Sequence, residues 1–170
     1  MGHKLQINQN NIDQWQTDED KITIIEKEDD INQIRKCKKE SIKINKSYIQ
    51  KICFSRIIKL KSLEEQDPFI RKFKEALYAY EEKLYEKNNK NVRASRLRDV
   101  FDIKKLHNPF IKSIIKKGIY KLVTKERQSD GFAALQSKNM KQYTLEYLVI
   151  EFSEEFPDEL VEFCKVKLGS

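Results

Sequence analysis

The chain is poor in the residues from which catalytic and cofactor sites are usually built. It has 4 glycines and 2 histidines among 170 residues. A nucleotide-binding loop needs clustered glycines, so that backbone N–H groups approach the phosphates, and these glycines are scattered. A hydrolase triad needs a histidine held between a nucleophile and an acid, whereas His107 stands beside a predicted helix cap. We therefore expect no enzyme and no cofactor.

Cysteine and long apolar runs are also scarce. Cys37, Cys53 and Cys164 share no close spacing, and a structural zinc site needs about four ligands at short intervals, so no metal site and no disulfide are expected. No apolar run approaches the roughly 20 residues of a membrane-spanning helix. The first residues are polar and acidic, unlike a secretory signal. The expected location is the cytosol or nucleus, and we favour the nucleus.

The chain is rich in charged residues, and these are unevenly distributed along the sequence. The net charge is +7 overall. Residues 1–34 carry a net −5, residues 35–66 carry +7, residues 92–142 carry +9 and residues 143–170 carry −5. Two basic blocks between acidic ends suggest a polyanion or an acidic partner.

The basic character has two interpretations. Lysine outnumbers arginine 27 to 7, and isoleucine outnumbers valine 20 to 6, a bias typical of AT-rich genomes. Ordinary solvated surfaces in a lysine-biased proteome would look similar. Arg93, Arg96 and Arg98 nevertheless lie close together in the sequence. Three neighbouring arginines are unexpected in a chain that favours lysine, so this cluster favours a functional role.

Hydrophobic spacing predicts a mainly helical chain. Residues 22–25 suggest a short strand and 31–34 a short helix within a weakly structured extension over 1–46. Ser47 and Gln50 form a capping box at the start of an amphipathic helix that runs to about Lys61, within a segment 47–66 that joins the core.

Asp67 and Pro68 begin a long helix, and a winged-helix-like domain with acidic C-terminal helices is predicted over 67–170. Within those acidic helices, Thr144 is predicted to cap one helix and Pro157 to start the last one. The side chains of Glu154 and Glu155 are predicted to lie on a solvent-exposed helix face.

Residues 108–136 carry the most specific fold signal. Asn108 and Pro109 suit a helix start, and Lys116, Lys117 and Gly118 suit a basic last turn with a left-handed stop. Residues 119–124 are β-branched and aromatic, and Asp130 with Gly131 is a dipeptide typical of hairpin turns. The expected fold is a winged helix-turn-helix with a small β hairpin and additional flanking helices.

Two family resemblances follow from these residues. The segment from Phe110 to Tyr120, continued through Asp130-Gly131-Phe132 to the helix after Thr144, resembles the C-terminal winged helix of the Stn subunit of the telomere-capping CST complex. That resemblance implies single-stranded DNA biology in which the module binds partner proteins more than DNA. The first 66 residues do not resemble that family's oligonucleotide-binding barrel. In composition the chain is similar to small helix-turn-helix subunits of protist DNA adenine methyltransferase complexes, although the homeodomain's base-reading pattern is absent.

The leading hypothesis is a non-catalytic DNA-binding accessory subunit of a multi-protein complex for telomere maintenance or DNA modification. A basic helix-turn-helix and wing would bind the phosphate backbone without strong sequence preference. Its protein partners would use the acidic C-terminal helices, with Leu160, Val161 and Phe163, and the N-terminal arm; alternatively, the acidic helices cover the domain's own basic surface. The alternative is a protein-interaction module without direct DNA contact. The candidate DNA-binding residues are Arg93, Arg96, Arg98, Lys104, Lys105, Lys112, Ser113, Lys116, Lys117, Lys121, Lys125 and Arg127.

Overall fold

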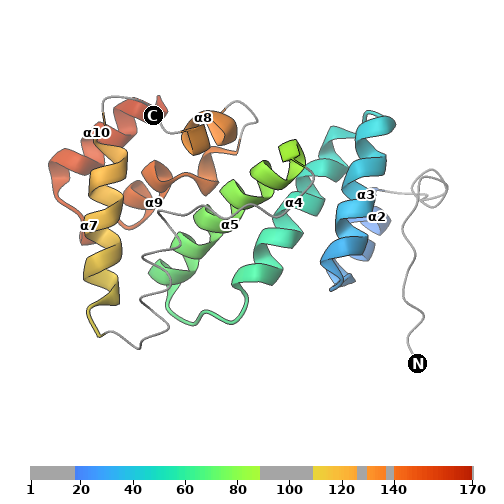
Figure 1. The fold of residues 1–170 in the computed structure, drawn as a ribbon, viewed down its shortest axis with the longest axis horizontal. Helices are drawn as coiled ribbons and strands as arrows, with labels where there is room; N and C mark the ends of the chain where they lie inside the picture. Colours follow the sequence, from blue (N-terminus) through green and yellow to red (C-terminus); the bar gives the residue numbers. More distant parts are fainter. Residues whose placement is uncertain (1–17, 89–108, 126–129, 137–139, 170) are drawn as a thin grey trace. The chain divides into compact units, whose positions relative to one another are not determined.

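The computed structural model describes residues 18–88, 109–125, 130–136 and 140–169 and is mainly helical, with no strand within those ranges (Figure 1). The chain divides into two compact units, Met1–Leu63 and Glu64–Ser170. The prediction of a mainly helical fold is therefore confirmed. Among the described helices, none has both the length and the apolar composition that crossing a membrane requires.

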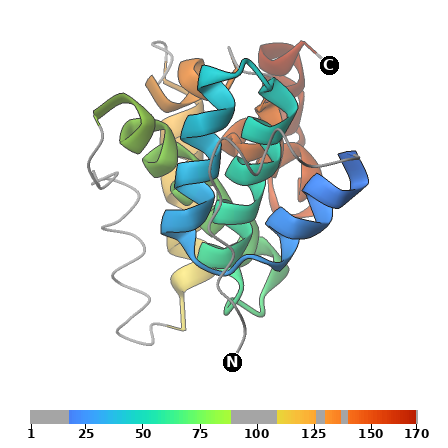
Figure 2. The ribbon, with the colours of Figure 1, turned by 90° about the vertical axis from the view of Figure 1, so that its right-hand side faces the viewer.

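The first unit is built from three helices, α2 (Asp18–Lys27), α3 (Ile31–Lys43) and α4 (Ser47–Ser62). α3 and α4 lie side by side, and α2 packs against α4 (Figure 2). Asp30 caps α3 by accepting from the Asn32 backbone N–H at 2.9 Å, which satisfies a donor that the helix itself leaves unpaired. The fully buried core of this unit consists of Ile25, Ile34, Cys37, Ile49, Cys53 and Ile57.

Three predictions for this unit differ from the structure. Residues 22–25, predicted as a strand, belong to α2, and α3 runs nine residues beyond the predicted Ile34. Residues 18–43 of the extension that was predicted to be weakly structured thus form two helices. The helix from Ser47 is confirmed, but its capping box is wrong: Lys46 is the cap residue and makes no side-chain cap bond, while Gln50 donates to the Ser41 carbonyl instead.

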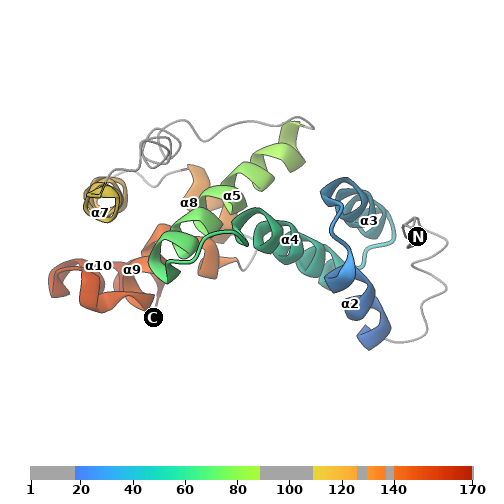
Figure 3. The same cartoon turned by 90° about the horizontal axis from the view of Figure 1, so that it is seen from below.

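The second unit contains α5 (Pro68–Asn88), α7 (Ile111–Val123), α8 (Asp130–Gln136), α9 (Leu145–Glu151) and α10 (Asp158–Leu168). Short 3₁₀ turns at Lys141–Tyr143 and Ser153–Glu155 precede and follow α9. Figure 3 is viewed almost along the axis of α7, which lies beside α9 and α10. The helices α5, α7, α9 and α10 share one core, which contains Phe69, Ile70, Phe73, Ile115, Ile119, Val123, Leu148, Val149, Phe156, Leu160, Val161 and Cys164.

The helix starts in this unit follow local chemistry. Asp67 accepts from the Ile70 backbone N–H at 2.9 Å, and Thr144 accepts from the Tyr147 backbone N–H at 3.2 Å, so both predicted caps are confirmed. Pro157 precedes α10 as predicted, and Gly169 ends it in the left-handed conformation with φ of 73°.

The predicted hairpin is wrong for the residues that the structure describes. Gly118 does not stop the helix, because residues 119–123 continue α7, and Asp130 and Gly131 begin α8 instead of a turn. Ile115, Ile119 and Val123 recur every four residues and are all buried, which one helix face achieves. A strand through the same segment would place Lys121 on the face of Ile119 and Val123. Asn108 lies outside the described residues, and Pro109, predicted at the helix start, lies in a turn before α7.

Candidate nucleic-acid interface

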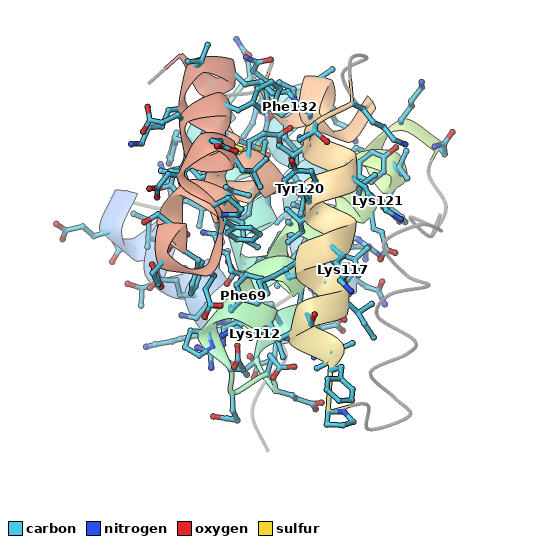
Figure 4. All side chains as sticks on the ribbon, turned by 90° about the vertical axis from the view of Figure 1, so that its left-hand side faces the viewer. Phe69, Lys112, Lys117, Tyr120, Lys121 and Phe132 are labelled. Atoms are coloured by element: carbon cyan, nitrogen blue, oxygen red, sulfur yellow. The ribbon has the colours of Figure 1, made fainter. Side chains whose placement is uncertain are left out.

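α7 turns one face to the core and the opposite face to solvent. Its exposed positions include Ser113, Lys117, Tyr120 and Lys121, which at 3.6 residues per turn fall within roughly 100° around the helix axis. We call these four residues the α7 stripe. Figure 4 shows Lys117 and Lys121 along one edge of α7 and Tyr120 on the edge nearer α10.

The cations of this surface have no counterion among the described residues. No ion pair or hydrogen bond to a described residue involves the ammonium groups of Lys117, Lys121 or the exposed Lys125, which follows α7. Lys117 and Lys121 are four residues apart on a helix, where like charges repel by a few tenths of a kcal/mol. The α7 stripe is therefore a surface that gains from a bound anion.

On the neighbouring edge of α7 two lysines share one carboxylate, so their charge is partly neutralised. Lys112 Nζ lies 2.7 Å from Glu155 Oε1, and Lys116 Nζ lies 3.2 Å from Glu155 Oε2. Lys112 Nζ also lies 5.2 Å from the centroid of the Phe69 ring, a favourable cation–π distance. Glu155 thus holds two lysines of α7 against the end of the turn after α9.

These ion pairs shift the pKa of both partners. Hydrogen bonds from Lys112 and then Lys116 lower the pKa of Glu155, and the hydrogen bond to Glu155 raises the pKa of Lys112. Because all three side chains are partly exposed, solvent screening keeps the stabilisation small. Lys112 and Lys116 have to leave Glu155 before they neutralise a phosphate.

The C-terminal end of α7 is fixed from α10. Lys167 Nζ donates to the carbonyl of Val123 at 3.2 Å and to Glu146 Oε1 at 2.6 Å, and it lies 4.7 Å from the centroid of the Phe132 ring. The Val123 carbonyl is one of the acceptors that a helix end leaves unpaired. Lys167 of α10 therefore contacts α7, α8 and α9, and these contacts orient the α7 stripe.

The predicted DNA-binding residues fall into three groups. Lys112 and Lys116 lie in ion pairs with Glu155, whereas Ser113, Lys117, Lys121 and Lys125 are exposed on or just after α7. Lys121 and Lys125 do not arm a wing strand, because Lys121 is helical and Lys125 directly follows the helix. The candidates outside the described residues are Arg93, Arg96, Arg98, Lys104, Lys105 and Arg127.

A second exposed surface lies on α10. Glu159, Glu162, Phe163 and Val166 are exposed at helical spacing, and Phe163 and Val166 retain 46% and 79% of their accessible surface. Leu160 and Val161, predicted to share a protein-contact face with Phe163, are buried in the core instead. We call the exposed four residues the α10 stripe; it combines acidic and apolar side chains.

Sequence reasoning missed three of these features. The sequence predicts a solvated Glu155 and offers a cover for the basic surface only as a general role of the acidic helices; the fold alone pairs Glu155 with Lys112 and Lys116, about forty positions earlier. The sequence names Tyr120, with Tyr78 and Tyr85, as a possible base-stacking residue, but it places Tyr120 on a strand, so the position of this ring on a helix beside Lys117 and Lys121 was not foreseen. The helical spacing of Glu162, Phe163 and Val166 was a signal in the sequence that would have found the α10 stripe.

Comparison with known proteins gives no relative. No protein-family model matches the chain, and neither a curated protein nor a solved structure shows significant similarity. In the part of the chain that the structure describes, no three or more histidine, cysteine or acidic side chains are grouped to hold a metal ion.

Proposed function

We propose that this protein is a non-catalytic accessory subunit that binds DNA through the α7 stripe. The observation that carries the proposal is the exposure of Lys117 and Lys121 on one helix, with no counterion among the described residues. Lysine ammonium groups are compact, flexible point charges, so such a surface recognises phosphate charge better than base sequence. Arginines 93, 96 and 98, in the same basic block of the sequence, would add phosphate contacts.

A salt-dependent titration tests the proposal. The double variant Lys117→Gln/Lys121→Gln removes two charges from the α7 stripe. If both lysines neutralise phosphates, the log–log dependence of affinity on salt becomes shallower by about 1.8 on duplex and about 1.4 on single-stranded DNA. Fluorescence anisotropy at several salt concentrations measures both slopes.

The matched control separates a local contact from net charge. Lys39 on α3 and Lys59 on α4 are also exposed lysines, and both belong to the first unit. The variant Lys39→Gln/Lys59→Gln changes the total charge equally. An equal loss in both double variants, or no DNA binding by the unchanged protein at low salt, refutes a role for the α7 stripe.

The α10 stripe favours a second candidate function, docking to a larger protein subunit. Burying Phe163 and Val166 would recover apolar surface that the chain leaves in water, at about 25 cal/mol per Å², and Glu159 and Glu162 would favour a basic partner surface. With a complex purified from the native source, Phe163→Asp/Val166→Asp should release the partner, while Glu154→Gln, on the 3₁₀ turn, should not. Retention of the partner by the first variant contradicts this candidate.

A further inference from the structure

Tyr120 presents its ring to solvent at one edge of the α7 stripe. Its side chain is 49% exposed, and among the described residues no aromatic ring or cation packs on it. Tyr147 on α9 provides the contrast, because Lys72 Nζ lies 5.1 Å from the centroid of its ring. The ring of Tyr120 is thus a π surface without an occupant in this part of the protein.

Two lysines lie near this ring on the same helix. Lys117 precedes Tyr120 by one turn and Lys121 follows it directly, and both are exposed. Figure 4 shows the two lysines on one edge of α7 and Tyr120 on the other. A polyanion whose phosphates lie along the lysine edge therefore passes within side-chain reach of the ring.

Single-stranded nucleic acid matches this arrangement better than a duplex. Proteins that bind single strands combine cations for the backbone with aromatic rings on which bases stack, and every base offers a π face. In a duplex the bases are already stacked on one another, so an exposed tyrosine has no free base to contact without unstacking. We infer that Tyr120 stacks on an unpaired base while Lys117 and Lys121 hold the flanking phosphates. This inference rests on the proposed function and adds the strand form of the ligand.

The test compares three probes on the full-length protein at one salt concentration: an oligo(dT) single strand, a duplex of equal length and inorganic polyphosphate, which has no bases. Tyr120→Ala should weaken oligo(dT) binding by about 5-fold to 150-fold, the range measured when stacking aromatics are removed. Duplex and polyphosphate affinities should change by less than about 2-fold. Tyr120→Phe, which keeps the ring, should retain the affinity for oligo(dT).

Two controls keep the result interpretable. Tyr147→Ala removes an exposed tyrosine from α9 and should leave all three affinities unchanged. Tyr120→Gln keeps a long side chain without a ring, and far-UV circular dichroism reports whether α7 remains helical in each variant. Loss of oligo(dT) affinity by both Tyr120→Ala and Tyr120→Gln, with unchanged helicity, supports the inference.

The outcomes distinguish the inference from the proposed function. If Lys117→Gln/Lys121→Gln weakens every probe while Tyr120→Ala weakens none, the stacking inference is overturned and DNA binding by the α7 stripe stands. If Tyr120→Ala weakens oligo(dT) and polyphosphate equally, the ring supports the helix and not a base, which also overturns it. If no probe binds at low salt, both proposals fail.

Discussion

Lys167 of α10 lies 2.6 Å from Glu146 of α9, and the two side chains retain only 14% and 5% of their accessible surface. Removing one member of such a pair leaves a largely desolvated charge without its partner. Glu146→Leu should therefore lower the free energy of unfolding by about 3 kcal/mol, measured by urea denaturation. Because Lys167 also bonds the Val123 carbonyl, the double variant Glu146→Leu/Lys167→Met should lose less stability than the sum of the two single variants. If the losses of the two single variants simply add, the ion pair is not the source of the effect.

The ion pairs of Glu155 should make stability depend on acid pH. Because Lys112 and Lys116 lower the pKa of Glu155 in the folded state, their contribution is present above its ordinary pKa and is lost as pH falls through the lowered value. Since the site is partly exposed, we expect less than about 1 kcal/mol. The difference in unfolding free energy between the unchanged protein and Glu155→Gln should be present at pH 7 and vanish near pH 3.

A neighbouring glutamate provides the control for this pH dependence. Glu154 is exposed on the same 3₁₀ turn and makes no ion pair with a described residue. Glu154→Gln should change stability little at either pH. On the alkaline side the Glu155 contribution should persist until pH rises through the pKa of Lys112, which Glu155 raises. A constant effect of Glu155→Gln from pH 3 to 7 would contradict the ion-pair explanation.

The three cysteines should be unreactive in the folded protein. Cys37, Cys53 and Cys164 are buried. Burial, with a smaller effect of Glu146, raises the pKa of Cys164 to about 12, and the hydrogen bond with Cys37, together with burial, raises the pKa of Cys53. Because the thiolate is the nucleophile, a disulfide reagent at pH 8 should label the native protein only as fast as it unfolds. In guanidinium chloride all three thiols should react at once; rapid labelling without denaturant would show that these sites open locally.

A larger side chain at Gly131 should destabilise the protein. A Cβ atom built at this position would lie 3.0 Å from Cδ2 of Tyr80 on α5. Because residue 131 has no side chain, α8 can approach Tyr80 this closely. Gly131→Leu should lower the unfolding free energy by about 1–3 kcal/mol through overpacking. Ala133 is exposed on the same helix, and Ala133→Leu should be nearly neutral. Equal effects of the two substitutions would argue against the close approach of α8 to Tyr80.

The helix caps were predictable because a cap is a local interaction. Asp67 and Thr144 reach backbone N–H groups three residues ahead, so the sequence contains both partners within one turn. Ser47 shows the limit of such reasoning. Its residue type and its spacing from Gln50 suit a capping box, yet Ser47 is the first residue of α4 and not the cap residue that precedes the helix.

The segment after Gly118 was mispredicted because its apolar spacing suits two structures. Ile119 and Val123 share a face of a helix, where they are four positions apart, and also a face of a strand, where every second residue points the same way. The β-branched composition favoured the strand. Packing of Ile115, Ile119 and Val123 against the core of the second unit decides for the helix, because only the helix buries all three and leaves Lys121 in solvent.

By itself the sequence determined the helical character of the chain, the confirmed caps and the separation of basic from acidic segments, since propensity, capping and charge are properties of residues and their near neighbours. The tertiary structure decided which lysines of α7 form ion pairs and which have no ion pair with a described residue. Glu155 meets Lys112 and Lys116 across about forty residues, and no local pattern encodes that pairing. The same packing turns Tyr120 outward beside Lys117 and Lys121, because the buried face of α7 fixes the direction of every other side chain on that helix.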